Sequence, residues 1–205
     1  MHISPKLIDN GLNWWIYMST DARTAHPFNS GPTKGGFNHP AIDLVLSPGR
    51  VEEIPEVQFF PTLGKILTVA NAPFSLLRTT ACDAKLLEIS DTSKNGGYSK
   101  VAGAWVQLAY RIEWHNQKSE KLLSLARMIQ SEIAMPNVPF SVRYTVSPYR
   151  SWYGRENAGF YGLALELAGK GHDARSAWAA ATEGCEIVAV AISKVGISDA
   201  LLYME

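Results

Sequence analysis

The segment from 149 to 157 contains the residue types that most directly indicate binding chemistry. It interleaves three aromatic side chains with two arginines: Tyr149, Arg150, Trp152, Tyr153 and Arg155. Guanidinium groups pair with phosphates and stack on bases, and aromatic rings offer flat surfaces to unpaired bases. The same composition is typical of protein interaction hot spots. The segment therefore predicts a binding loop for single-stranded nucleic acid or for a protein, and its alternative role is a hairpin held to the body by its aromatics.

A second candidate is the Gly- and Pro-rich stretch 26–40, which contains His26, Lys34 and His39. Backbone amides in Gly-rich turns can hold an anion, and Lys34 could add positive charge. The GxxxxGK[ST] pattern of a P-loop is absent, and no carboxylate spacing supports a metal site with the two histidines. We expect a binding or docking loop and no bound metal.

A third candidate is the turn Gly169-Lys170-Gly171-His172, which leads into a helix capped by Asp173. The start of a helix attracts phosphate, so Lys170 could bind an anion and His172 could act as a general base beside it. With His26 and His39, His172 would be a catalytic residue of a small, metal-independent nuclease or transferase. A Gly-rich turn capped by Asp173 explains the same residues without catalysis.

The elements around these residues are clearest in the C-terminal half. Period-2 and period-3.6 patterns predict, in order, a strand at 104–114, a helix, a strand at 140–146, a strand at 160–168, a helix and a strand at 186–193. The first helix is capped by Asn116 or Ser119, and its apolar stripe consists of Leu122, Leu125, Ala126, Ile129 and Ile133. The second helix ends at Gly184. This βαββαβ order is the ferredoxin-like arrangement, with helices on one face of the sheet.

The N-terminal half is predicted to be β-rich, so the fold class is α+β. Its expected strands span about 12–20, 41–47, 56–60 and 65–71, and a short helix is expected near 82–90. The polar segment 91–100 suggests a division into parts 1–96 and 97–205, although the two could form one continuous domain. Because 186–193 is apolar on both sides, we expect the N-terminal half to cover it.

Residues 104–193 also resemble an RNA-recognition-motif domain. Gly159-Phe160 and Leu163 match its third-strand signature, and residues 173–177 resemble the start of its second helix. The resemblance implies that Phe160 and Trp105 stack on bases and that Arg111 and Arg143 flank them. Gly162 stands where that family has a further aromatic. In the alternative interpretation, this face packs against the N-terminal half, with both aromatics in the core.

Composition narrows the functional class further. The 19 basic and 19 acidic side chains cancel, which disfavours a protein that grips long duplex DNA. Cys82 and Cys185 form no metal or disulfide pattern, so a reducing, cytoplasmic setting is expected. No signal peptide or membrane span is indicated, and no membrane partner is expected. Without a dinucleotide fingerprint, a nucleophile elbow or an HExxH motif, we expect no cofactor.

These observations favour a protein that acts by binding and not by catalysis. The preferred ligand is RNA or another single-stranded nucleic acid. The first alternative is a protein interaction or assembly module, which could be a homo-oligomer. The second is the His-dependent nuclease or transferase described above.

Overall fold

The structure is a computed structural model that describes residues 14–18, 42–90, 92, 96–133, 137–149 and 160–202. In chain order, this part of the protein forms β1 (Trp14–Met18), η1 (Pro48–Glu53), α1 (Pro55–Phe59), α2 (Pro61–Ala70), β2 (Leu77–Glu88), β3 (Lys100–Tyr110), η3 (Glu113–Gln117), α3 (Ser119–Glu132), β4 (Phe140–Tyr149), β5 (Phe160–Gly171) and α4 (Ala174–Leu202). The elements labelled η are 3-10 helices. The α+β class is confirmed.

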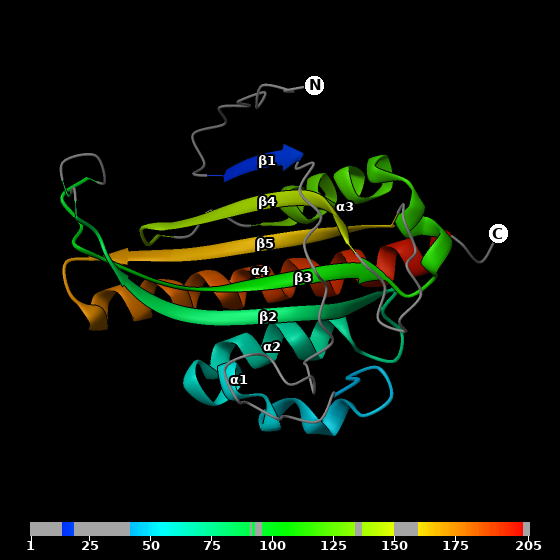
Figure 1. The fold of residues 1–205 in the computed structure, drawn as a ribbon, viewed down its shortest axis with the longest axis horizontal. Helices are drawn as coiled ribbons and strands as arrows, with labels where there is room; N and C mark the ends of the chain where they lie inside the picture. The colour runs from blue at the N-terminus through cyan, green and yellow to red at the C-terminus, as the bar shows by residue number, and fades with distance from the viewer. Residues whose placement is uncertain are drawn as a thin grey trace.

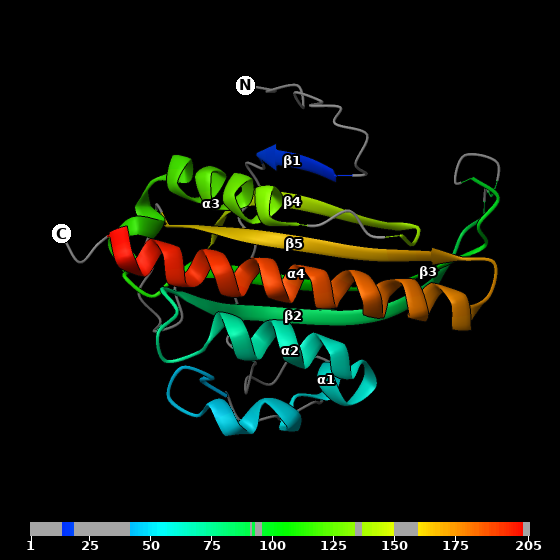
Figure 2. The same cartoon turned by 180° about the vertical axis from the view of Figure 1, so that it is seen from behind.

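One sheet with the strand order β1-β4-β5-β3-β2 organises the fold. β1 runs parallel to β4, and the other neighbours are antiparallel. The helices α3 and α4 cross one face of the sheet, and α2 packs beside α4 along the β2 side (Figures 1 and 2). Within the described residues, the opposite face carries no helix, and we call it the helix-free face.

The core lies between the sheet and these helices. Alternate residues of the central strands are fully buried there, including Val106, Leu108 and Leu165. The predicted stripe of α3 is confirmed for Leu122, Leu125, Ala126 and Ile129, which are all buried, whereas Ile133 follows the end of the helix and is partly buried. Ala177 and Ala181 let α4 lie close to β5, because both side chains are small and fully buried.

The complete ferredoxin-like order is not present. β3, α3 and β4 form a split βαβ unit, because β3 and β4 are parallel with β5 between them. The predicted last strand, 186–193, is instead part of α4. The sheet position beside β3 is filled by β2, which precedes β3 in the chain and pairs with it antiparallel. A short apolar run is compatible with a buried helix as well as with a buried strand, and for this reason the strand prediction for 186–193 was wrong.

Most elements predicted for the N-terminal half are also wrong. Residues 42–47 form no strand, 56–60 and 65–71 fall mainly in α1 and α2, and 82–90 falls mainly in β2. Pro55 and Pro61 occupy the first positions of α1 and α2, where proline favours a helix start. The strand expected at 12–20 is confirmed over Trp14–Met18. The segment 91–100 connects β2 to β3, so one sheet continues across it.

Three glycines have roles that differ from the predicted ones. α4 continues through Gly184, where an added Cβ would overlap the ring of Phe140, so this glycine permits close packing and does not end the helix. Gly169 and Gly171 belong to β5 and not to a turn. Added Cβ atoms there would overlap the backbone nitrogens of Ala181 and Ala177 in α4.

Two polar side chains are fully buried on the helix-free face. Within the described residues, neither Gln107 nor Ser147 has a hydrogen-bond partner for its side chain. The Gln107 amide lies directly over Gly162. A Cβ added at Gly162 would be only 2.5 Å from the Nε2 atom of Gln107. This contact explains why a small residue stands where the resemblance would place an aromatic.

Replacing Gln107 with leucine should therefore stabilise the protein by about 1 kcal/mol, because burying an unsatisfied amide opposes folding and leucine has no polar atoms to satisfy. Urea unfolding of the wild type and Gln107→Leu measures the difference. A clear loss of stability would show that the amide makes a favourable interaction in solution.

Candidate functional site

The predicted binding residues Trp105 and Arg143 lie in one row across the helix-free face. Backbone pairing aligns Asp83 with Trp105, Trp105 with Glu166, and Glu166 with Arg143. Side chains directly opposite each other in such a register share a face and interact. Four strands therefore place an aromatic ring among two carboxylates and a guanidinium.

Beside this row the face is hollowed. The hollow has a volume of about 670 Å³, and we call it the sheet hollow; its lining consists of Asp83, Lys85, Leu87, Val101, Gly103, Ala104, Trp105, Arg143, Glu166, Leu167 and Ala168. Its depth comes from small residues, because Gly103 pairs with Ala168 in its floor. A Cβ at Gly103 would overlap the carbonyl oxygen of Leu167, so only glycine fits this close approach.

The charges around the sheet hollow are mixed. Arg143 donates from Nη1 to Glu166 Oε2 over 3.2 Å, and both side chains are partly exposed. Asp83 accepts the backbone N–H of Ala84 at 2.8 Å. Lys85 is exposed, and Lys170 lies two residues beyond Ala168 on the same face of β5. The arrangement can contact a flat ring at Trp105 and an anion at its basic groups.

The second predicted stacking residue lies elsewhere. Phe160 begins β5, pairs with Tyr149 at the end of β4, and is only 8% exposed in a small cluster with Ala109. It lies six positions before Glu166 of the Trp105 row, which corresponds to about 20 Å of strand. The structure thus brings Trp105, Arg143 and Lys170 to one region and leaves Phe160 and Tyr149 at the far end.

Arg111 does not lie on the helix-free face with them, because β3 ends at Tyr110. Its guanidinium instead donates to the carbonyl oxygens of Asn71, Ala72 and Leu77 at 2.7–2.8 Å, and of Pro73 at 3.3 Å. Burial, and then the nearby Arg78, lower the pKa of Arg111. Its role in the structure is to hold the connection from α2 to β2.

His172 is exposed, and its ring centroid lies 5.0 Å from that of Tyr98. The predicted cap is confirmed next to it, because Asp173 Oδ1 accepts the backbone N–H of Ser176 at 2.7 Å. Hydrogen bonds from Ser176 lower the pKa of Asp173. No cluster of three or more His, Cys, Asp or Glu that could hold a metal occurs within the described residues.

Several predicted site residues lie outside the described residues, and their roles stay predictions. They are His26, Lys34, His39, Arg150, Trp152, Tyr153 and Arg155.

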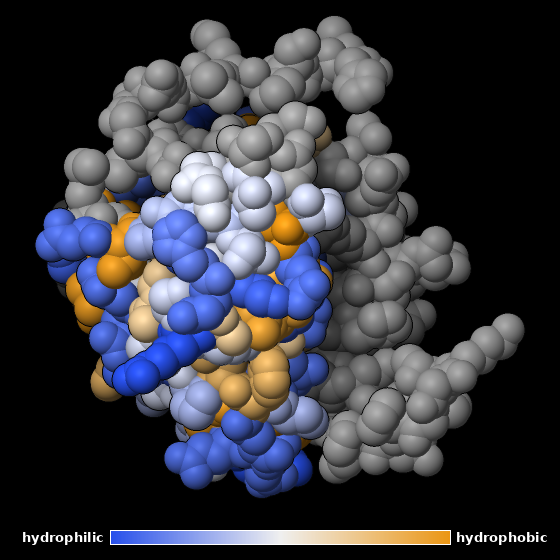
Figure 3. Space-filling model, turned by 90° about the vertical axis from the view of Figure 1, so that its left-hand side faces the viewer, coloured by the Kyte–Doolittle hydropathy of each residue, from blue (hydrophilic) through white to orange (hydrophobic). Residues whose placement is uncertain are grey.

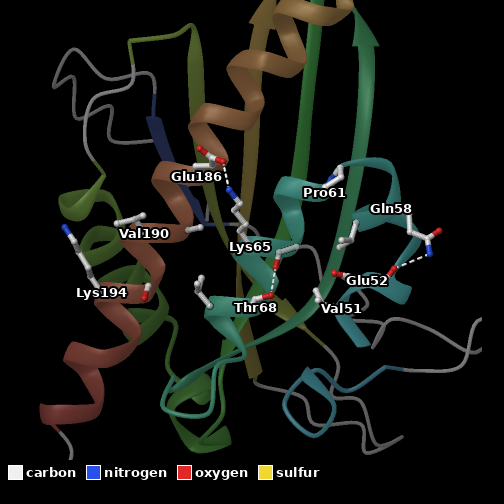
Figure 4. A pocket seen from close by; sticks show the side chains of 14 residues that line it. Val51, Glu52, Gln58, Pro61, Lys65, Thr68, Glu186, Val190 and Lys194 are labelled. Atoms are coloured by element: carbon white, nitrogen blue, oxygen red, sulfur yellow. Dashed lines mark hydrogen bonds and ion pairs between the residues drawn. The ribbon is translucent and has the colours of Figure 1, made fainter. Parts of the chain in front are cut away.

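A second candidate site was missed by the sequence analysis. A groove of about 990 Å³ runs between η1, α1, α2 and α4, and we call it the helix groove (Figure 4); it is lined by Val51, Glu52, Val57, Gln58, Pro61, Gly64, Lys65, Thr68, Val69, Glu186, Ala189, Val190, Ser193 and Lys194. The sequence analysis missed the helix groove because it predicted strands at 65–71 and 186–193, which belong mainly to the helices α2 and α4. The helix-start proline at Pro61 was a usable signal.

Ion pairs brace the helices at this groove. Lys65 of α2 pairs with Glu186 of α4 at 2.5 Å, a bond drawn in Figure 4. Lys194 of α4 pairs with Glu132 of α3 at 3.1 Å. Between these two pairs, Val190 is 56% exposed.

Comparison with known proteins gives no family. No family model matches the chain. The comparisons with curated proteins and with solved structures found no match either. The functional argument therefore depends on the geometry of the sheet hollow and the helix groove.

The end of the molecule with the β2–β3 connection shows hydrophilic and hydrophobic residues interspersed (Figure 3), which is typical of ordinary solvent-facing surface. Within the described residues, no helix is both long and apolar enough to cross a membrane.

Proposed function

We propose that the protein binds single-stranded nucleic acid at the sheet hollow. The observation that carries this proposal is the placement of Trp105 beside a hollow with a glycine and alanine floor, with basic side chains at its margin. A base has a flat face that stacks on an aromatic ring whatever its identity. Lys85, Arg143 and Lys170 are the groups offered to the phosphates.

The size of the sheet hollow supports this ligand class. Its volume of about 670 Å³ is within the range of roughly 300–1,000 Å³ that small ligand sites occupy. The carboxylates of Asp83 and Glu166 can accept hydrogen bonds from base amino groups, as carboxylates do from cytosine. Since these acids offset the basic groups, the surface suits a short single-stranded segment better than a duplex with its dense charge.

Replacing Trp105 with leucine should weaken binding to a short single-stranded oligonucleotide by about tenfold or more, because a lost base stack costs roughly 1–3 kcal/mol. Fluorescence polarisation with labelled RNA and DNA oligomers at low salt measures the change. Trp114→Leu is the matched control: Trp114 is 56% exposed, lies beyond the end of β3 and stacks on His115.

The control variant should bind as the wild type does. Equal weakening by both substitutions would point to a general effect on the protein. Unchanged binding by Trp105→Leu, or no binding by the wild type to any oligomer, would exclude the sheet hollow as a nucleic-acid site.

A further inference from the structure

The outer surface of α4 presents one narrow row of exposed side chains. Glu186, Val190, Lys194 and Ile197 follow one another at spacings of four, four and three residues, which places them on one helix face. The residues between them are packed inward, including Val188, Ala191, Ile192 and Val195. We call these four exposed residues the α4 row.

The α4 row includes two exposed apolar side chains. Val190 is 56% exposed and Ile197 is 53% exposed. Val190 also lines the helix groove, and Pro61, Gly64 and Ala189 line the same groove. Exposed apolar residues at the rim of a concave apolar surface often mark a docking site.

We infer that a second copy of this chain docks here, with the two α4 helices antiparallel and a twofold axis at Val190. The arrangement of charge selects this partner. Around Val190, Glu186 lies four residues before and Lys194 four residues after, each about 6 Å along the helix. An antiparallel twofold pair therefore sets Glu186 of each copy opposite Lys194 of the other.

A parallel pair would instead oppose each of these charges to its own kind, which is unfavourable. The antiparallel register alone gives two opposite-charge contacts about an apolar centre. Such self-complementarity is what an isologous interface requires, because one surface must fit itself.

The neighbouring ion pairs extend this match. Lys65 already contacts Glu186, and Glu132 already contacts Lys194. In the docked pair, Lys65 and Glu186 of one copy would lie in line with Lys194 and Glu132 of the second copy. The charges along this line would alternate in sign. The axis repeats this line, so each of these four charges lies next to a charge of opposite sign.

The helix groove gives the second helix a concave apolar surface to pack against. Figure 4 shows Glu186, Val190 and Lys194 along α4 at one side of it, with Lys65 and Thr68 of α2 alongside. From Glu183 to Ile197, both exposed, the contact along α4 would extend about 21 Å. The sheet hollow is on the opposite face of the sheet, so docking leaves it open and does not depend on the proposed nucleic-acid binding.

The first test is the mass of the full chain in solution. Sedimentation equilibrium over a range of concentrations should give twice the chain mass of 22.5 kDa. Val190→Asp should weaken self-association at least about tenfold, because two carboxylates would meet on the axis. Leu46→Asp is the matched control: Leu46 is 80% exposed and lies outside the helix groove, so this variant should remain dimeric. A wild type that stays monomeric, or a dimeric Val190→Asp, would overturn the inference.

Charge reversal gives a second test that does not depend on an apolar change. Glu186→Lys alone and Lys194→Glu alone should each weaken the dimer, and the double variant should recover part of the lost association. Both intrachain pairs, with Lys65 and Glu132, stay broken in the double variant. Recovery can therefore come only from contacts between copies. A double variant that associates no better than the single ones would contradict the inference, with circular dichroism confirming that each variant is folded.

Discussion

Replacing Gly169 with alanine is expected to destabilise the protein by about 3 kcal/mol, at the upper end of overpacking effects. The added methyl group would overlap the backbone nitrogen of Ala181 and lie 2.6 Å from the carbonyl oxygen of Ala177. These are main-chain atoms of a long helix, so no side-chain rotation relieves the overlap. α4 would have to move away from β5, which would loosen the core between them. Urea unfolding followed by circular dichroism measures the loss.

Gly49→Ala is the control for this prediction. Nothing lies within 4 Å of a Cβ added at Gly49, which is in η1 at the surface. Its effect should stay within about 0.5 kcal/mol, as for most surface substitutions. Comparable stability of both variants would mean that α4 does not approach β5 as closely as described.

Gly169 also shows where reasoning from the sequence stopped. Two glycines around Lys170 were interpreted as a turn, because glycine is common in turns. Their actual requirement is space for a helix that packs against the strand, and that helix begins only after Asp173. A glycine needed for close packing and one needed for a turn have the same local sequence signal, so only the tertiary contact distinguishes them.

The elements that could be predicted are those with a long, regular pattern. The stripe from Leu122 to Ile129 identified α3, and alternation identified the strands β3, β4 and β5 within a few residues. The failures were short apolar runs such as 65–71 and 186–193. Within such a run, helix and strand bury similar residues, and the choice depends on what packs against them.

The same limit applies to the candidate sites. Alternation was sufficient to place Trp105 and Arg143 on one face, and the backbone register then made them members of one row. The helix groove was missed, because it exists only where α2 and α4 pack together, and the segments 65–71 and 186–193 that line it had been interpreted as strands. The prediction for Arg111 was wrong for a different reason. Strand alternation would place it on the same face as Trp105, but β3 ends at Tyr110, one residue before it.

Arg111 is where the second large effect is expected. Replacing it with leucine should cost about 3 kcal/mol, because hydrogen bonds from a charged donor contribute roughly 1.5–3 kcal/mol each and partial exposure reduces their sum. The carbonyls of Asn71 and Ala72, which lie at the end of α2, would lose the donor that joins them to Leu77 at the start of β2. Chemical unfolding measures the loss.

Arg111→Lys separates shape from charge. A lysine ammonium keeps the positive charge but concentrates three donors at one point, whereas the carbonyls of Asn71, Pro73 and Leu77 surround a planar group with five. We therefore expect the lysine variant to recover less than half of the lost stability. Arg127→Lys, at an exposed position on α3, should change stability little. If Arg111→Lys were as stable as the wild type, the positive charge alone would hold the connection between α2 and β2, and the multiple contacts of the guanidinium would be unnecessary.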